Sequence, residues 1–240
     1  MKAITFIAIT LLAGAIAGTI LGTINQVAVE PYIEHAIELE MQNTAQSGQV
    51  INPAEFAAYR LWQKGGEIIA GTILGLSIGS LYGIVFVYTR GSISGNNKKK
   101  ALIVASIMWF VLFLMPALKY PPNPPAVGDP ETIYYRQSLY VAFLAISGFS
   151  ALGLAFLYRK MVSLNTKKAI IPSAYAAIMA GAYLAMPANP DPINVPIDLV
   201  IGFRITSAIT ISMFWALLGV IFGAFWDKLN PDETARINIR

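Results

Sequence analysis

The chain has 240 residues, of which 56% are hydrophobic and only 12% charged, and its mean hydropathy is +0.59. This composition excludes a soluble globular domain and makes membrane lipid the main surroundings of the chain. The formal charge of +4 lies in short basic clusters between apolar runs, which excludes a nucleic-acid-binding face. The chain has no cysteine and one histidine, His35, so disulfides, thiolate metal sites and two-histidine motifs are excluded.

Six apolar stretches without Asp, Glu, Lys or Arg follow one another, and each is long enough to cross ~30 Å of hydrocarbon as a helix. They cover residues 3–29, 68–88, 101–118, 137–158, 169–190 and 205–226. The motif Met115-Pro116-Ala117 is expected to end the third helix, and Pro187 to end the fifth near Met186. The first stretch exceeds the ~7 to 15 apolar residues of a signal peptide, which favours a retained helix over a cleaved leader. The predicted fold class is an all-α integral membrane protein with six transmembrane helices.

The orientation of the helices follows from the charges between them, because cytoplasmic connections are enriched in Lys and Arg. If the termini share one side with the even-numbered connections, that side holds twelve of the seventeen basic residues, and it is therefore predicted to be cytoplasmic. The opposite, outer side holds ten of the thirteen acids: Glu30, Glu34, Glu38, Glu40, Glu55, Glu67, Asp129, Glu131, Asp191 and Asp198. The sequence therefore predicts an acidic outer face.

A repeat of three helical hairpins is expected within a single membrane domain of residues 1–240. The hairpins cover 1–90, 98–160 and 167–228, and a short cytoplasmic tail follows at 229–240. Met-Pro-Ala recurs at the expected ends of the third and fifth helices, and an aromatic residue followed by arginine opens each even helix, at Tyr59-Arg60, Tyr135-Arg136 and Phe203-Arg204. These recurrences favour a parallel pseudo-repeat. The alternative is that interfacial aromatics and arginines are ordinary membrane anchors.

The three arginines of these pairs, Arg60, Arg136 and Arg204, are predicted to have a structural role. Each is expected near the positive end of an even helix, which is unfavourable unless acids compensate the charge. Ion pairs that close each hairpin are the favoured interpretation, and an anion-binding role is the alternative.

Two glycine stripes are predicted to form a helix interface in the first hairpin. Glycines recur every fourth residue in both helices, at Gly14, Gly18 and Gly22 and at Gly71, Gly75 and Gly79. In lipid, such stripes let two backbones approach closely, and the resulting van der Waals packing is a main source of helix association. We therefore predict a structural interface here rather than a pore.

A candidate metal site lies in the segment after the first helix, which is expected to form a short interfacial helix from Glu30 onward. Glu34, His35 and Glu38 fall within one helical turn, so two carboxylates and an imidazole can converge on a divalent transition metal. Ligands from Asp129 or Asp191 would have to complete the site. The alternative is an acidic amphipathic helix with a solvated polar face.

The proline-rich segment 119–132 is predicted to be a stiff, extended loop. Asp129 followed by Pro130 is typical of the capped start of a helix, which would explain Asp129 without a ligand role. The alternative is a lid over the outer end of the helices.

Enzymatic chemistry is not indicated, and we expect neither catalytic residues nor a tightly bound cofactor. The chain has no Walker-type glycine loop and no nucleophile elbow, and its single histidine limits acid–base schemes. No Asp, Glu, Lys, Arg or His lies inside the six apolar stretches to act as a proton relay.

The loop 119–132, together with Glu30-Pro31 and the run 36–40, resembles the CbtA family of predicted cobalt transporter subunits. This resemblance implies a prokaryotic inner-membrane component of cobalt uptake, with Co2+ or a related divalent metal as substrate. It also implies a small histidine-bearing membrane partner, CbtB. Many members are described with five spans, where six are predicted here. A non-transporting structural subunit of another membrane complex is the alternative function.

Overall fold

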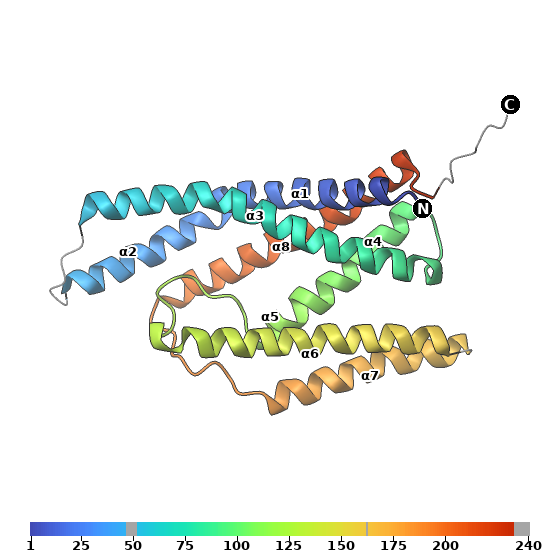
Figure 1. The fold of residues 1–240 in the computed structure, drawn as a ribbon. Helices are drawn as coiled ribbons and strands as arrows, with labels where there is room; N and C mark the ends of the chain where they lie inside the picture. The colour runs from blue at the N-terminus through green and yellow to red at the C-terminus, as the bar shows by residue number, and fades with distance from the viewer. Residues whose placement is uncertain (47–51, 162, 233–240) are drawn as a thin grey trace. The chain divides into compact units, whose positions relative to one another are not determined.

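The computed structural model describes residues 1–46, 52–161 and 163–232, and every regular element within these ranges is helical (Figure 1). In chain order the elements are α1 (Ala3–Ala28), α2 (Glu30–Gln46), α3 (Pro53–Thr89), the 3-10 turn η1 (Arg90–Ser92), α4 (Asn97–Trp109), the π-helix η2 (Phe110–Leu114), α5 (Met115–Lys119), the 3-10 turn η3 (Pro130–Thr132), α6 (Ile133–Lys160), α7 (Leu164–Ala185) and α8 (Ile197–Leu229).

Within the described residues, six helical segments are long and apolar enough to cross a membrane, as the sequence predicted. They are Ala3–Ala28, Pro53–Ser92, Asn97–Lys119, Pro130–Lys160, Lys168–Ala185 and Ile197–Leu229. The fifth ends at Ala185, in agreement with the expected stop before Pro187. The connections after the first, third and fifth spans are called the odd connections below: residues 29–52, 120–129 and 186–196.

The third span differs from expectation, because Met115-Pro116-Ala117 does not end it. The helix passes through Pro116 and ends at Lys119. A π-helical stretch, Phe110–Leu114, precedes the proline and changes the hydrogen-bond register there. The expectation was wrong because the bundle supplies a local adjustment that lets the helix continue past the proline.

The chain divides into two compact units. The first comprises Met1–Pro31, Gln42–Ile107 and Thr206–Arg240, and the second comprises Tyr32–Met41 and Met108–Ile205. The predicted single domain of three hairpins, with its parallel pseudo-repeat, stays a prediction. Of the predicted tail 229–240, residues 233–240 lie outside the described part of the chain.

In the first unit α1 packs along α3 through the two glycine stripes (Figure 1). A Cβ atom built on Gly18 would lie 2.8 Å from the Cα of Gly75, and one built on Gly79 would lie 2.8 Å from the Cα of Gly14. Real Cβ atoms essentially never come so close to backbone atoms. Only glycine therefore fits where these two backbones meet.

An aromatic cluster fills the other part of this unit. Tyr82 and Phe86 of α3 pack against Phe222 and Trp226 of α8, with ring centroids 4.9 Å apart for three of these pairs. The Tyr82 hydroxyl is buried and donates to the carbonyl of Ala101 in α4 at 2.6 Å. The phenol thus satisfies its polar group within an apolar core.

The second unit is built around a smaller core of Tyr120, Leu139, Phe143 and Met179. These side chains come from the end of α5, from α6 and from α7, so the core joins the third, fourth and fifth spans. The Tyr120 and Phe143 rings meet edge to face, with centroids 5.8 Å apart. Tyr120 therefore links this core to the odd connection that follows the third span.

Candidate functional site

The predicted metal-binding turn lies on an exposed face of helix α2. Glu34, His35 and Glu38 are exposed, whereas Ala36 is fully buried. The Tyr32 ring packs against Gly202 of α8, at a position where any Cβ atom would collide with it. The alternation of buried and exposed positions fixes one face of the helix and leaves the acidic turn on the other.

These three side chains do not form a complete metal centre in the described ranges. Among residues 1–46, 52–161 and 163–232, no group of three or more His, Cys, Asp or Glu side chains could hold a metal ion. The five predicted ligands, Glu34, His35, Glu38, Asp129 and Asp191, therefore stay a prediction as a set. The structure brings two of them together, Asp129 and Asp191, in a different arrangement.

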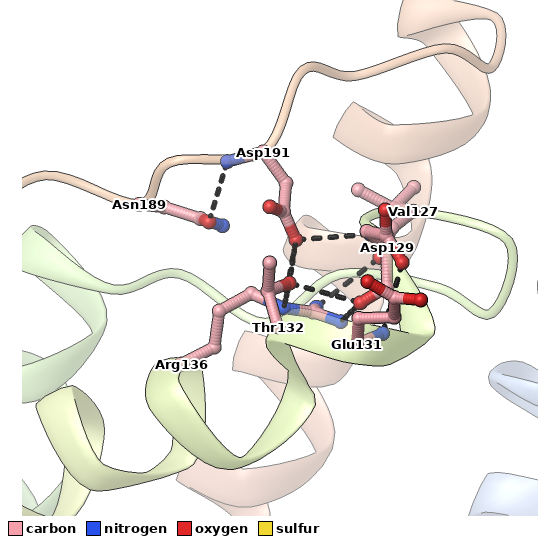
Figure 2. Close-up of polar contacts among 7 residues, drawn as sticks. All are labelled: Val127, Asp129, Glu131, Thr132, Arg136, Asn189 and Asp191. Carbon is pink, nitrogen blue, oxygen red and sulfur yellow. Dashed lines mark hydrogen bonds and ion pairs between the residues drawn. The ribbon is translucent and has the colours of Figure 1, made fainter.

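Asp191 is the acceptor of a hydrogen-bonded cluster between two odd connections (Figure 2). Its Oδ2 atom forms an ion pair with Nε of Arg136 at 2.9 Å and accepts from the Thr132 hydroxyl at 2.6 Å. The same oxygen accepts the backbone N–H of Asp129 at 3.0 Å. The Asp191 side chain is only 5% exposed, so three donors compensate for the burial of its charge.

Short-range hydrogen bonds in the turns position the residues of this cluster. The Asp129 carboxylate accepts the N–H of Glu131 at 2.9 Å and thus caps the helical turn ahead of α6, as predicted. Asn189 accepts the N–H of Asp191 at 3.1 Å and sets the direction of that connection. Arg136 also donates to the carbonyls of Val127, at 3.3 Å, and of Asp129, at 3.1 Å. The Arg136 guanidinium therefore binds both the backbone of the proline-rich loop and the Asp191 carboxylate.

Gly128 is required by this arrangement. Its φ of +94° is a conformation that L side chains rarely adopt. A Cβ atom here would also lie 2.5 Å from Oδ2 of Asp191 and 2.7 Å from Cζ of Arg136. The loop backbone is thus pressed directly against the ion pair.

The same two connections are joined a second time by Tyr120. Its hydroxyl donates to the carbonyl of Pro187 at 2.6 Å. Burial raises the pKa of Tyr120, with a smaller contribution from Tyr135. Next to it, the Lys119 ammonium donates to the carbonyl of Tyr183 at 2.8 Å and lies 4.5 Å from the centroid of that ring. The ends of α5 and α7 are therefore fastened to each other.

Arg204 contacts the proline-rich loop rather than an acid. Its Nη2 donates to the side-chain oxygen of Asn123 at 2.7 Å, and its Nε lies 3.3 Å from the carbonyl of Pro122. Arg60 forms an ion pair with Glu30, whose side chain is 9% exposed, and donates to Gln63 at 2.6 Å. All three predicted arginines, Arg60, Arg136 and Arg204, therefore contact polar groups in or near the odd connections.

Several of these partners were not singled out from the sequence. Thr132 and Asn123 carried a detectable signal, since both lie in the proline-rich loop. Ser147 and Tyr175, which meet inside the second unit, carried none, because one hydroxyl in an apolar span looks like any small or interfacial residue. The π-helix beside Pro116 could have been suspected, because proline removes a backbone donor.

The part of the chain that the structure describes has six helices able to cross a membrane, with polar clusters in the connections between them, and this defines a polytopic helical membrane protein. The family model described as "Probable cobalt transporter subunit (CbtA)" matches residues 3–227, and the chain therefore belongs to this family. The match confirms the resemblance carried by the proline-rich loop. No curated protein and no solved structure matches the chain significantly.

Proposed function

We propose that this protein is the membrane subunit of a cobalt uptake system in the inner membrane of a prokaryote, and that it captures the metal at the outer face. Family membership supports the substrate class, since CbtA is described as a probable cobalt transporter subunit. In the proposed orientation the termini are cytoplasmic and the odd connections face outward. This orientation rests on the uneven distribution of Lys and Arg between the connections.

The observation that carries the capture site is the exposure of Glu34, His35 and Glu38 on one side of α2. His35 and Glu38 are three residues apart and Glu34 and Glu38 are four apart, spacings that bring helical side chains close together. Imidazole nitrogen and carboxylate oxygen suit Co2+ and its neighbours in the first transition row. An imidazole binds a metal through an unprotonated ring nitrogen.

The remaining two ligands, Asp129 and Asp191, belong to the same compact unit as this turn of α2. Asp191 is engaged by Arg136, Thr132 and the Asp129 backbone, so it would assist only after Arg136 releases it. We therefore propose Glu34, His35 and Glu38 as the first contact for the metal. The excess of acids on the odd connections concentrates cations around them.

Transport across the membrane is proposed to depend on a partner. No Asp, Glu, Lys, Arg or His lies within the predicted apolar stretches, so this chain offers the metal few ligands along its spans. A small membrane protein with histidines, similar to CbtB, would supply the ligands that this chain lacks. Membrane lipid covers the remaining apolar surface.

The test is cobalt accumulation in cells that carry the protein together with its small partner. His35→Ala and Glu38→Gln are expected to weaken the apparent affinity for cobalt about tenfold or more, because each removes a ligand. Glu40→Gln is the matched control, since it removes the same charge from an exposed position of α2 that points away from His35. Membrane insertion of each variant is checked by its yield in the membrane fraction.

Two results would contradict the proposal at different levels. If cells with the His35 and Glu38 variants accumulate as much cobalt as cells with the Glu40 control, the turn of Glu34, His35 and Glu38 is only a solvated helix face. If the unmodified protein accumulates no more cobalt than cells without it, the chain is a structural subunit of another membrane complex.

A further inference from the structure

The third span contains a carbonyl that no helical N–H satisfies. In the π-helix Phe110–Leu114, the N–H of Met115 donates to the carbonyl of Phe110, five residues earlier. In this register the donor for the carbonyl of Val111 would be residue 116. That residue is Pro116, which has no N–H. The Val111 carbonyl must therefore find a partner outside its own helix.

Ser147 of α6 supplies the missing donor. Its hydroxyl donates to the Val111 carbonyl at 2.6 Å, and its side chain is fully buried. A backbone carbonyl left unpaired in the apolar interior would be costly, since no water reaches it. The serine thus does for Val111 what a backbone N–H does elsewhere in the helix.

A second hydroxyl extends the contact to α7. The Tyr175 hydroxyl lies 2.7 Å from the Ser147 oxygen. Because the one hydroxyl hydrogen of Ser147 is directed to Val111, Tyr175 is the donor in this bond. The Tyr175 ring also lies beside Phe110, with centroids 5.9 Å apart. Tyr175, Ser147 and Val111 therefore form a relay across the fifth, fourth and third spans.

The segment beyond the break is coupled to the odd connections. Helix α5, Met115–Lys119, leads straight into Tyr120, whose hydroxyl holds Pro187. Lys119 holds the end of α7 in the same way. A change of direction at the break would therefore move the two connections that Arg136 and Asp191 join. π-helical turns and prolines are the usual places where a membrane helix bends.

We propose that residues 110–116 are a hinge in the third span, and that the relay of Ser147 and Tyr175 holds the hinge closed. Side-chain hydrogen bonds suit this role, because they can be released and remade without unwinding the helices on either side. The hinge goes beyond metal capture and does not depend on it, since it can be examined in the absence of metal.

The experiment is a double-mutant cycle between Ser147 and Pro116. Amide hydrogen exchange is measured for each variant, on the purified full chain in detergent. Ser147→Ala leaves the Val111 carbonyl unpaired and is expected to raise exchange in residues 111–120 at least about tenfold. Pro116→Ala returns an N–H to the helix, so adding Ser147→Ala to it should change exchange little. Tyr175→Phe is expected to have a smaller effect than Ser147→Ala.

Ser106→Ala is the matched control, because the Ser106 hydroxyl bonds within its own helix, to Leu102 at 2.9 Å. It should leave exchange in residues 111–120 unchanged. Equal effects of Ser147→Ala with and without Pro116→Ala would overturn the proposal. So would an acceleration of exchange that is spread evenly over the helices and is no larger at 111–120 than elsewhere, because the relay would then be a static brace. If Ser147→Ala alone gives no folded protein, recovery of folded yield in the double variant supports the hinge, and lack of recovery refutes it.

Discussion

Arg136 in α6 and Asp191 in the connection before α8 form an ion pair at 2.9 Å, and the backbone of Gly128 is packed against both side chains. The guanidinium additionally holds the proline-rich loop through the carbonyls of Val127 and Asp129. One charged pair thus determines the position of two connections at once. These two connections are not helical, and the ion pair fixes their backbones in place of helical hydrogen bonds.

Removing the acid of this pair should destabilise the protein. Asp191→Ala leaves the largely buried Arg136 without its counter-ion and removes an acceptor from Thr132. We expect a loss of about 1–3 kcal/mol, measured as lower thermal stability in detergent. Asp198→Asn is the control, since Asp198 is exposed in the first turn of α8. Equal stability of the two variants would show that the ion pair contributes nothing.

The glycine stripe of α3 should tolerate alanine at some positions and not at others. A Cβ atom at Gly75 would lie 2.7 Å from the Cα of Gly18, so Gly75→Ala should separate α1 from α3 and cost about 1–3 kcal/mol. Nothing lies within 4 Å of a Cβ atom at Gly66 in the same helix. Gly66→Ala should therefore leave stability unchanged or raise it by up to about 1 kcal/mol. Thermal denaturation of both variants is the measurement, and similar losses would argue against close packing.

A pH-dependent contact joins the turn that follows α8 to the 3-10 turn η1 at the end of α3. Asp232 accepts two hydrogen bonds from Arg90, at 2.6 and 2.8 Å, and these bonds lower the pKa of Asp232 below its ordinary value of 3.8. A carboxyl with a lowered pKa stabilises the fold when it is ionised. Its contribution is therefore complete above about pH 5, and it is lost as the pH falls through the folded-state pKa.

Comparison of the unmodified protein with Asp232→Asn checks this sign. The stability difference should be constant from about pH 7 to about pH 5 and should shrink toward zero below about pH 4. It should stay under about 1 kcal/mol, because the Asp232 side chain is 48% exposed. A difference that grows on acidification would contradict the assignment.

The proposed orientation can be tested directly, because the chain has no cysteine. Single cysteines at Gln46 and Asn194, in or next to odd connections, should react with an impermeant thiol reagent added outside intact cells. Cysteines at Ser94 and Thr166 should react only after the membrane is opened. All four positions are exposed in the structure, so access depends on the side of the membrane. The reverse labelling pattern would invert the orientation.

Much of the secondary structure was accessible from the sequence. The six spans follow from uninterrupted apolar runs, since lipid admits only helices whose backbone groups are satisfied within the segment. The end of the fifth span before Pro187 and the cap formed by Asp129 follow from local rules, and both are confirmed. Pro116 shows the limit of such rules, because the helix continues past it.

What the sequence by itself determined is the set of local and compositional properties: six helices able to cross a membrane, an acidic turn at His35 and a proline-rich loop after the third of these helices. Only the tertiary structure decided the partners across the chain. The fold pairs Asp191 with Arg136, a partner 55 positions away in the sequence, and Ser147 of α6 donates to the carbonyl of Val111 in the third span. The physical reason is that a buried charge or an unpaired carbonyl needs hydrogen-bond partners. Packing decides which donor lies within reach, and that donor can be far away in the sequence.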